Sequence, residues 1–303
     1  GIPMNRKATA SVLGAGSLWG VISIFIRQLN AVGLSALQIG MLRALISAVV
    51  IFLWLGITHR ELLVICPCHL WYFIGTGVIS MAFFNWCYFT VIEISQASIA
   101  VVLLYTSPIF VMVLSAIFFR EKITAKKVLV LIMTFLGCVL VAGLLGGDYA
   151  LTPTVLLLGL GSGLFYALYS IFGSVALEVY DTRTVTAYTF LFATLGTLPI
   201  CDVGTLVEKI AIQPSSLFWC VGIALVSTLA PYLLYTWGLS HMSNSRAAIL
   251  ATIEPLVGAL VGILLYKEPA NLMKLLGMAL IFSAVIILNL GSKEKQSQEQ
   301  LSE

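Results

Sequence analysis

Ten runs of about 20 apolar residues follow one another along this chain, each separated from the next by a short polar or turn-forming stretch. A helix of that length crosses the hydrocarbon core of a bilayer and satisfies its own backbone hydrogen bonds there. The predicted fold class is therefore an all-α integral membrane protein with ten transmembrane helices. We place these helices at 11–30, 37–57, 70–92, 97–118, 126–146, 153–176, 183–201, 217–239, 246–265 and 272–291.

Composition and motifs exclude several classes of function. Only 10% of the residues are charged, against about 25% in soluble domains, so a lipid bilayer must cover most of the surface. The net charge of +3 is too small and too dispersed for a nucleic-acid-binding protein. No phosphate-binding loop and no catalytic pairing within a span is present, so we expect neither a primary pump nor an enzyme, and no cofactor. A receptor or scaffold would need an added soluble domain, and none is visible.

The basic residues predict the orientation in the membrane. Ten spans place both termini on one side, and eleven of the sixteen Lys and Arg residues fall on that side. Because positive charge accumulates in cytoplasmic loops, we expect both termini in the cytoplasm of a bacterial-type inner membrane.

The expected organisation follows from these spans. Residues 1–10 hold a cytoplasmic N-terminus that begins with Gly1-Ile2-Pro3, interpreted as a cloning remnant ahead of Met4. A first five-helix repeat covers 11–146, a periplasmic or extracellular linker 147–152, and a second five-helix repeat 153–291. The polar segment 292–303 is predicted to be a disordered cytoplasmic tail.

An internal repeat is the most informative pattern after the spans. At an offset of 147 residues, Gly14-Ala15-Gly16 falls on Gly161-Ser162-Gly163 and Pro108 falls on Pro255, without a gap. The pair Arg120-Glu121 likewise falls on Lys267-Glu268. Five spans per repeat is an odd number, so the second copy inserts upside down. Such inverted repeats are typical of secondary transporters, whose substrate site lies near the bilayer midplane between the copies.

The same residues resemble the drug/metabolite transporter superfamily, in its EamA-like branch. The resemblance covers about Ala8 to Gly291 and implies a central cavity lined mainly by spans 1–4 and 6–9. It also implies alternating access and export of amino acids, other metabolites or drugs, but no diagnostic site residue. The residues that carry it are Trp19-Gly20, Arg43, Tyr88, Ala97-Ser98-Ile99-Ala100, Pro108, Arg120-Glu121-Lys122 and Gly137, then Tyr235, Asn244-Ser245-Arg246-Ala247, Glu254-Pro255 and Lys267-Glu268.

Two charged residues inside spans are the sharpest site candidates. A carboxylate at a helix centre costs roughly 2.5–3.5 kcal/mol, so Glu254 should face a wet cavity or a partner. We predict that it binds a cationic group or carries a coupling proton; the alternative is a structural ion pair. Arg43 could bind a substrate carboxylate, although an ion pair or a side chain that reaches the membrane surface is favoured.

Hydroxyl, amide and aromatic side chains complete the predicted substrate site. Ser80, Phe84 and Tyr88 are spaced by four and share a helix face, as do Ser227, Pro231 and Tyr235. These side chains either line the cavity or hold the bundle together through hydrogen bonds between helices. The predicted substrate-binding set is Trp19, Ser80, Asn85, Tyr88, Tyr105, Tyr166, Ser227, Tyr235 and Glu254. Pro108, Pro231, Pro255, Gly16 and Gly163 are predicted hinge or packing residues.

The short motif Cys66-Pro67-Cys68-His69 raises the question of a metal site. Its spacing fits no standard zinc pattern, so we expect no metal and a reduced cytosolic loop.

The function predicted from the sequence is a secondary transporter, proton-coupled or facilitative, that exports small metabolites such as amino acids. The alternative is a transporter of organic cations, quaternary amines or drugs. We expect a monomer whose partners are its substrate, the bilayer and protons as the candidate coupling ion.

Overall fold

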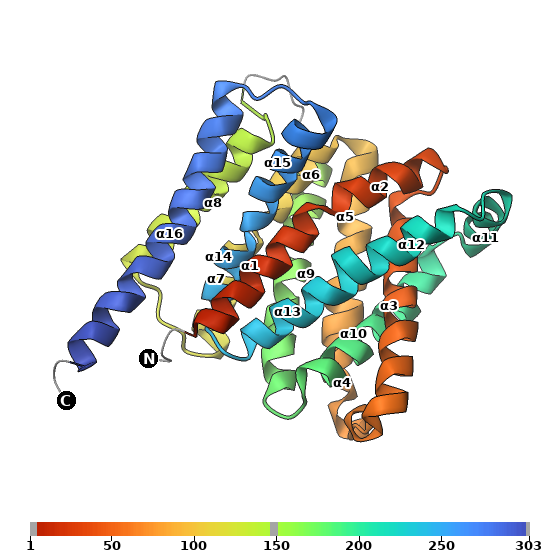
Figure 1. Cartoon of the computed structure of the whole chain (residues 1–303), viewed down its shortest axis with the longest axis horizontal. Coiled ribbons are helices and arrows are strands. Elements are labelled where there is room, and N and C mark those ends of the chain that lie inside the picture. Colours follow the sequence, from red (N-terminus) through yellow and green to blue (C-terminus); the bar gives the residue numbers. More distant parts are fainter. Residues whose placement is uncertain (1–4, 146–150, 301–303) are drawn as a thin grey trace.

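The computed structural model describes residues 5–145 and 151–300 of the chain (Figure 1). Within these residues all regular structure is helical, which confirms the all-α class. Gly1-Ile2-Pro3, most of the predicted linker and the last three residues lie outside the described residues. The elements are, in order, α1 (Arg6–Gly20), α2 (Ile22–Ala31), α3 (Ala36–Thr58), η1 (Arg60–Leu63), η2 (Pro67–His69), α4 (Leu70–Phe73), η3 (Ile74–Ala82), α5 (Phe83–Ile94), α6 (Ala97–Leu104), α7 (Ser107–Phe118), α8 (Ala125–Val141), α9 (Pro153–Leu177), α10 (Thr182–Thr197), η4 (Leu198–Ile200), α11 (Val203–Ile212), α12 (Ser216–Ala224), η5 (Leu225–Leu229), α13 (Ala230–Leu239), α14 (Asn244–Ala251), α15 (Ile253–Tyr266) and α16 (Leu272–Gln300).

Eight helical segments of the described chain are long and apolar enough to cross a membrane. They are Arg6–Ala31, Ala36–Thr58, Pro67–Ile94, Ala97–Phe118, Pro153–Leu177, Ser216–Leu239, Asn244–Tyr266 and Leu272–Leu290. A ninth candidate, Thr182–Ile200 with Val203–Ile212, is bent by 99°. The remaining predicted run, 126–146, corresponds to α8, which has 17 residues. Large apolar side chains such as Phe118 and Leu264 are 65% and 73% exposed, as expected of surfaces that lipid covers.

Helices of the first half of the chain pack against helices of the second half. Helix α1 packs against α13 and α15, α8 against α16, and α5 against α9, while α3 and η3 pack against α10. In Figure 1, α1 crosses the middle of the bundle beside α13 and α15, and α8 and α16 form a pair at one side. The start of α1 and the end of α16 lie at the same end of the bundle (Figure 1).

One span in each half is broken near its middle at an equivalent place. Helix α6 ends at Leu104 and α7 begins at Ser107, whereas α14 ends at Ala251 and α15 begins at Ile253. Pro108 and Pro255 lie in the first turn of the new helix. Backbone N–H groups have no partner within the helix there, so proline, which lacks this group, breaks no hydrogen bond. The two breaks therefore occur at equivalent distances along the two halves.

Each break packs against a glycine of the opposite half. A Cβ atom added to Gly16 of α1 would lie 3.0 Å from the Ala251 carbonyl oxygen. One added to Gly163 of α9 would lie 3.1 Å from the Leu103 carbonyl oxygen. Only glycine lets the two backbones approach this closely.

The third and eighth predicted spans contain π-helical segments that end 147 residues apart, η3 at Ala82 and η5 at Leu229. Pro231 follows η5 in the first turn of α13. Hydrogen bonds from i to i+5 widen the helix there, a distortion that is frequent at functional sites.

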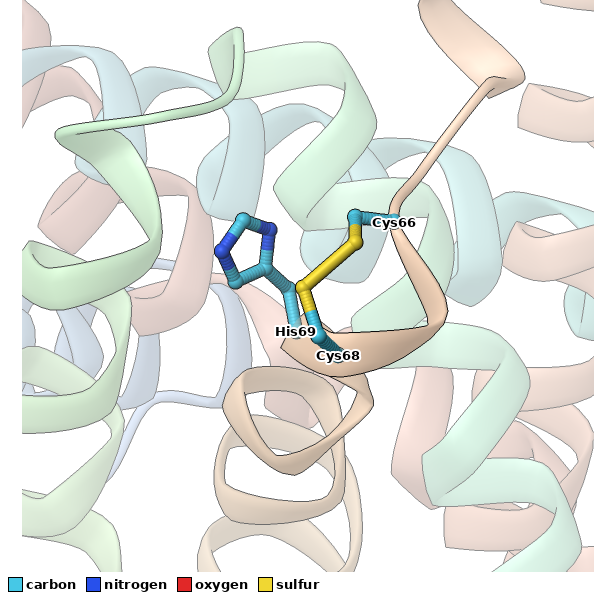
Figure 2. A group of neighbouring side chains, drawn as sticks. All are labelled: Cys66, Cys68 and His69. Atoms are coloured by element: carbon cyan, nitrogen blue, oxygen red, sulfur yellow. A yellow bond between two sulfur atoms is a disulfide. The ribbon is translucent and has the colours of Figure 1, made fainter.

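The segment between α3 and α4 is fastened to the second half by hydroxyl groups. Thr184 Oγ1 donates to the Leu62 carbonyl oxygen at 2.6 Å, and the Tyr188 hydroxyl donates to the Leu63 carbonyl oxygen at 2.5 Å. Cys66 and Cys68 in this segment are joined by a disulfide (Figure 2), so the expectation of a reduced loop is wrong for this structure.

One further expectation from the sequence is wrong, and one connection contains an additional helix. Helix α16 continues to Gln300, where a disordered tail was predicted from 292, because Lys, Glu and Gln propagate a helix well. The predicted connection between 201 and 217 contains α11, whose start is capped by the Asp202 side chain bonded to the Thr205 N–H.

Candidate functional site

A cavity of about 130 Å³ lies where the two halves meet. It is built by α1 and α2, α3, α5 and the end of α6 from the first half, and by α9, α13 and α15 from the second. Its lining residues are Trp19, Ile22, Ile26, Ala36, Ile39, Arg43, Phe84, Asn85, Tyr88, Phe89, Leu104, Tyr166, Tyr232 and Glu254.

Arg43 supplies a positive charge to the cavity. Its Nε donates to the Thr228 hydroxyl at 2.8 Å, and Thr228 in turn donates to the Ile223 carbonyl oxygen at 2.9 Å. This anchor, which is available because η5 opens the backbone of that span, directs the guanidinium inward. The interpretation that Arg43 reaches the membrane surface is therefore wrong.

Glu254 supplies a negative charge to the same cavity. It lies in the first turn of α15, where the helix dipole favours an anion, and the Tyr105 side chain lies beside it. The ion pairs of the described residues include neither Arg43 nor Glu254. Two opposite charges thus face one cavity without forming an ion pair, and Arg43 is held instead by the Thr228 hydroxyl group.

Aromatic rings form much of the remaining wall. Trp19 packs edge-to-face on Tyr232 with ring centroids 5.2 Å apart. Phe84 contacts Tyr166 at 5.2 Å and Tyr88 at 5.5 Å between centroids. Ring faces of this kind attract cations, and their edges and hydroxyl groups can bind polar ligand atoms.

The cavity contains many of the residues predicted from the sequence. Those that line it are Trp19, Arg43, Asn85, Tyr88, Tyr166 and Glu254, while Tyr105 stands behind Glu254. Phe84, which shares a predicted helix face with Tyr88, also lines the cavity, whereas Tyr232 and the aliphatic lining residues were not in the predicted substrate-binding set. Nothing in the sequence distinguishes an isoleucine that faces a cavity from one that faces lipid.

Three predicted residues do not line the cavity. The Ser227 hydroxyl donates to the Leu18 carbonyl oxygen at 2.8 Å, close to the α1–α2 break at Val21. The Tyr235 hydroxyl is 2.7 Å from Ser170 Oγ, and both residues are buried. Ser80 is buried within η3, whose wider turn moves it off the face that carries Phe84 and Tyr88.

Glu121 joins the two halves at the end of the bundle where α1 starts. Its Oε1 accepts hydrogen bonds from the Ser245 hydroxyl and from the Ser245 N–H at 3.4 Å, and it pairs with Lys127 Nζ at 2.9 Å. Ser245 belongs to the first turn of α14, so this carboxylate caps a helix of the other half.

The equivalent residue at the opposite end, Glu268, has different partners. It pairs with Arg27 Nη2 at 2.9 Å and with Lys274 Nζ at 3.4 Å. Ser98, which lies 147 positions before Ser245, donates instead to the Gln96 side chain at 3.4 Å. The Glu268 side chain is 38% exposed and the Glu121 side chain 14%. The halves are thus joined at both ends but by different contacts, a helix cap from Glu121 at one end and the ion pair of Glu268 with Arg27 at the other.

Both glutamates are presented by the same backbone turn. Arg120 and Lys267 adopt left-handed conformations with φ of 53° and 52°. The next N–H groups, of Glu121 and Glu268, donate to the Ser115 and Gly262 carbonyl oxygens at 3.2 Å and 3.0 Å. These bonds close the two helix ends, and the carboxylates project from equivalent places.

Comparison with known proteins points to one family. The model of the EamA-like transporter family matches residues 6–143 and again residues 153–290, which confirms the resemblance found in the sequence. A relative from Archaeoglobus fulgidus, named an uncharacterized transporter, is 27% identical over 290 residues and covers 93% of this chain and 96% of its own length. The uncharacterized transporter YwfM of Bacillus subtilis is 22% identical over 294 residues, covering 95% of both chains. One solved crystal structure shares the fold, with a TM-score of 0.80 over 96% of this chain and 99% of its own, at 16% identity.

Proposed function

Because the chain belongs to the EamA-like transporter family, we propose that it is a secondary transporter that exports small zwitterionic metabolites such as amino acids. The observation that carries the proposal is the pair of opposite charges, Arg43 and Glu254, which face one cavity without forming an ion pair. An amino acid presents a carboxylate and an ammonium group to such a pair. The guanidinium binds the carboxylate through two parallel hydrogen bonds, and Glu254 binds the ammonium.

The size and walls of the cavity support a small metabolite. Pockets for drug-sized ligands occupy about 300–1,000 Å³, whereas this cavity has about 130 Å³. Its aromatic and aliphatic walls suit an apolar side chain beside the two charged groups. Asn85 adds an amide that can donate and accept hydrogen bonds.

The alternative is transport of an organic cation. Glu254 and the rings of Trp19, Tyr88 and Tyr166 would favour such a ligand. Arg43 opposes it, because a second positive charge faces the same small space. The zwitterion therefore satisfies every charged group in the cavity, and a simple cation does not.

Alternating access between two inverted five-helix repeats is the proposed mechanism. It is supported by the double match to one family model, by broken spans at equivalent positions, and by glycines that contact each break from the other half. Ten spans with both termini in the cytoplasm complete this proposal, because the basic residues concentrate on that side.

The two glutamate turns supply the switch in this mechanism. In the state described, Glu121 caps α14 and closes the end where α1 starts, while Glu268 is drawn to Arg27 and Lys274. Exchange of the roles of the two repeats predicts a second state, in which Glu268 caps α6 at Ser98 and Glu121 is released. Each turn closes one end of the pathway, and the two states differ in which cap is made.

Glu254 is the proposed carrier of a coupling proton. When Glu254 is protonated, its carboxyl group is neutral. It then releases an ammonium ligand and adds no net charge to the cavity while the protein changes state. A facilitative mechanism would not need this step. The dependence of transport on an imposed pH gradient, measured in proteoliposomes, separates the two.

The test is a thermal-shift screen of the purified protein with matched ligands: neutral amino acids, the amines made by removing their carboxylate, and the acids made by removing their ammonium. A ligand at 100 times its Kd stabilises the protein by about 2.7 kcal/mol. We expect an amino acid to raise the Tm of the native protein and both analogues to do so weakly. Arg43→Gln and Glu254→Gln should each abolish the amino-acid shift.

Glu93→Gln is the matched control, since Glu93 is an exposed acid outside the cavity. This variant should keep the full shift. If amines bind strongly to the native protein and equally or more strongly to Arg43→Gln, the substrate is an organic cation and not a zwitterion. Equal Tm shifts in the native protein and in both cavity variants would show that the ligand does not bind in this cavity.

A further inference from the structure

A second group of ligand-type atoms lies outside the cavity, at the turn that precedes α4. Cys66, Cys68 and His69 each offer one ligand atom, and these atoms lie within 4.8 Å of one another. Pro67 begins η2 and turns the chain so that both sulfur atoms and the imidazole gather on one side of the turn (Figure 2). The two cysteines are exposed, so ions in solution can reach them.

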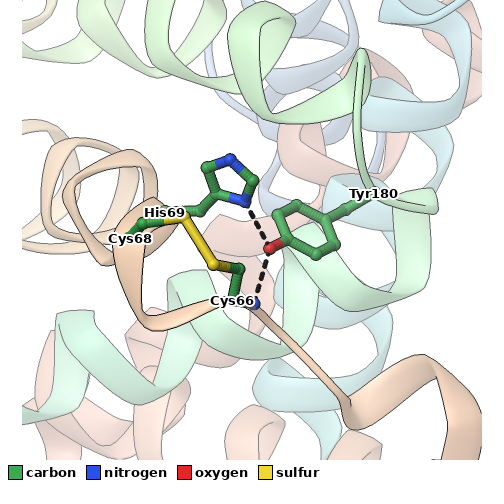
Figure 3. The surroundings of a disulfide bond; sticks show 4 residues. All are labelled: Cys66, Cys68, His69 and Tyr180. Carbon is green, nitrogen blue, oxygen red and sulfur yellow. Dashed lines mark hydrogen bonds between the residues drawn. A yellow bond between two sulfur atoms is a disulfide. The ribbon is translucent and has the colours of Figure 1, made fainter.

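The imidazole of His69 is held in one orientation by two tyrosines. It stacks on Tyr72 with centroids 4.8 Å apart and an interplanar angle of 10°, and it meets Tyr180 edge-on at 5.5 Å. Its Nδ1 is 2.7 Å from the Tyr180 hydroxyl, which also accepts the Cys66 N–H at 2.9 Å (Figure 3). The nitrogen that lies toward the two sulfur atoms is Nδ1, whereas Nε2 lies on the far side of the ring (Figures 2 and 3). In the disulfide form the Tyr180 hydroxyl therefore bonds the nitrogen that would bind a metal ion.

The donor set is soft. Two sulfur atoms and one imidazole, with no carboxylate in the group, select zinc and similar thiophilic ions over magnesium or calcium. The other cysteines do not resemble this pair: Cys87, Cys138 and Cys220 are buried among apolar side chains. From these observations we propose that Cys66, Cys68 and His69 form a site for a thiophilic metal ion such as Zn²⁺ when the two cysteines are reduced.

The disulfide and the metal are mutually exclusive occupants of this turn. A dithiol reductant passes two electrons and two protons to the Cys66–Cys68 bond and becomes a disulfide itself. Metal binding then displaces both thiol protons, and Nδ1 of His69 exchanges the Tyr180 hydroxyl for the ion, so that two thiolates and one nitrogen make three bonds to it. Water fills the fourth position of a tetrahedral zinc site, as in other sites with three protein ligands.

The test is titration of the purified, reduced protein with Co²⁺, followed by displacement with Zn²⁺. Thiolate bound to Co²⁺ gives a charge-transfer absorption, which reports sulfur ligation directly and needs no transport assay. We expect one Co²⁺ per chain in the reduced protein, none in the oxidised protein, and release of Co²⁺ by an equal amount of Zn²⁺. The C66S/C68S double variant should lose the absorption.

Two further variants separate ligands from neighbours. His69→Gln should weaken Zn²⁺ binding more than tenfold, whereas Tyr180→Phe, which removes the hydrogen bond that competes for Nδ1, should not weaken it. Cys201→Ser, which changes a cysteine outside the turn, should bind as the native protein does. Absence of the absorption after reduction, or its persistence in C66S/C68S, would overturn the proposal. Either result would leave the proposed function of the cavity unaffected, because the ligand screen tests that function independently.

Discussion

The contact between Glu121 and Ser245 can be broken without changing the size of the side chain. Glu121→Gln keeps an acceptor oxygen and removes the charge. Hydrogen bonds to a charged group contribute about 1.5–3 kcal/mol each and are roughly twice as strong as neutral ones. Two such bonds reach Oε1 from Ser245, so the variant should destabilise the closed end by about 1.5–3 kcal/mol. That energy corresponds to a rise of roughly 10–150-fold in the open population.

Amide hydrogen exchange measures this population directly. Exchange of a helix amide follows the fraction of molecules in which its hydrogen bond is open. With the protein in lipid nanodiscs, we expect the Ser245 N–H at the start of α14 to exchange at least tenfold faster in Glu121→Gln than in the native protein.

Glu268→Gln is the matched control, because it makes the same chemical change at the equivalent turn. Its partners are Arg27 and Lys274, so it should leave exchange at Ser245 unchanged. If both variants accelerate exchange equally, or neither does, Glu121 does not close this end of the bundle and the proposed switch is wrong.

Two predictions concern packing. Gly16→Ala should lower the Tm in detergent, since a Cβ would lie 3.0 Å from the Ala251 carbonyl oxygen and overpacking costs about 1–3 kcal/mol, whereas Gly14→Ala, with 3.7 Å to Leu234, should not. Equal Tm values for the two variants would rule out the tight contact. Tyr235→Phe should lose about 1–3 kcal/mol of stability by leaving Ser170 unpaired, yet keep the native ligand affinity, because Tyr235 does not line the cavity. A weaker ligand affinity in this variant would place Tyr235 in the binding site after all.

The helical fold could be predicted well because every span must be an apolar segment that satisfies its own backbone hydrogen bonds within the membrane. Runs of about 20 apolar residues and the charges between them mark where helices begin and end. The tail was predicted poorly for a related reason. Its polar residues predict exposure to water, and exposure does not prevent helix formation by Lys, Glu and Gln.

The site could be predicted in part. Glu254 and Arg43 stand out because a charge inside a span is costly, and their cavity location agrees with that reasoning. Ser80 was grouped with Phe84 and Tyr88 on the assumption of regular α-helical spacing, and η3 breaks that spacing. Thr228, which orients Arg43, gives no signal in sequence, since its role depends on the local widening at η5.

The attachment of the 62–66 segment has a consequence for how the halves can move. Tyr180, Thr184 and Tyr188, all from the second half, bind backbone atoms of Cys66, Leu62 and Leu63 of the first. Because these hydrogen bonds hold the two halves together along one edge, the halves cannot separate there and can only rotate about that edge. We therefore expect the largest displacement along the far edge, where Glu121 meets Ser245, and almost none beside Tyr188.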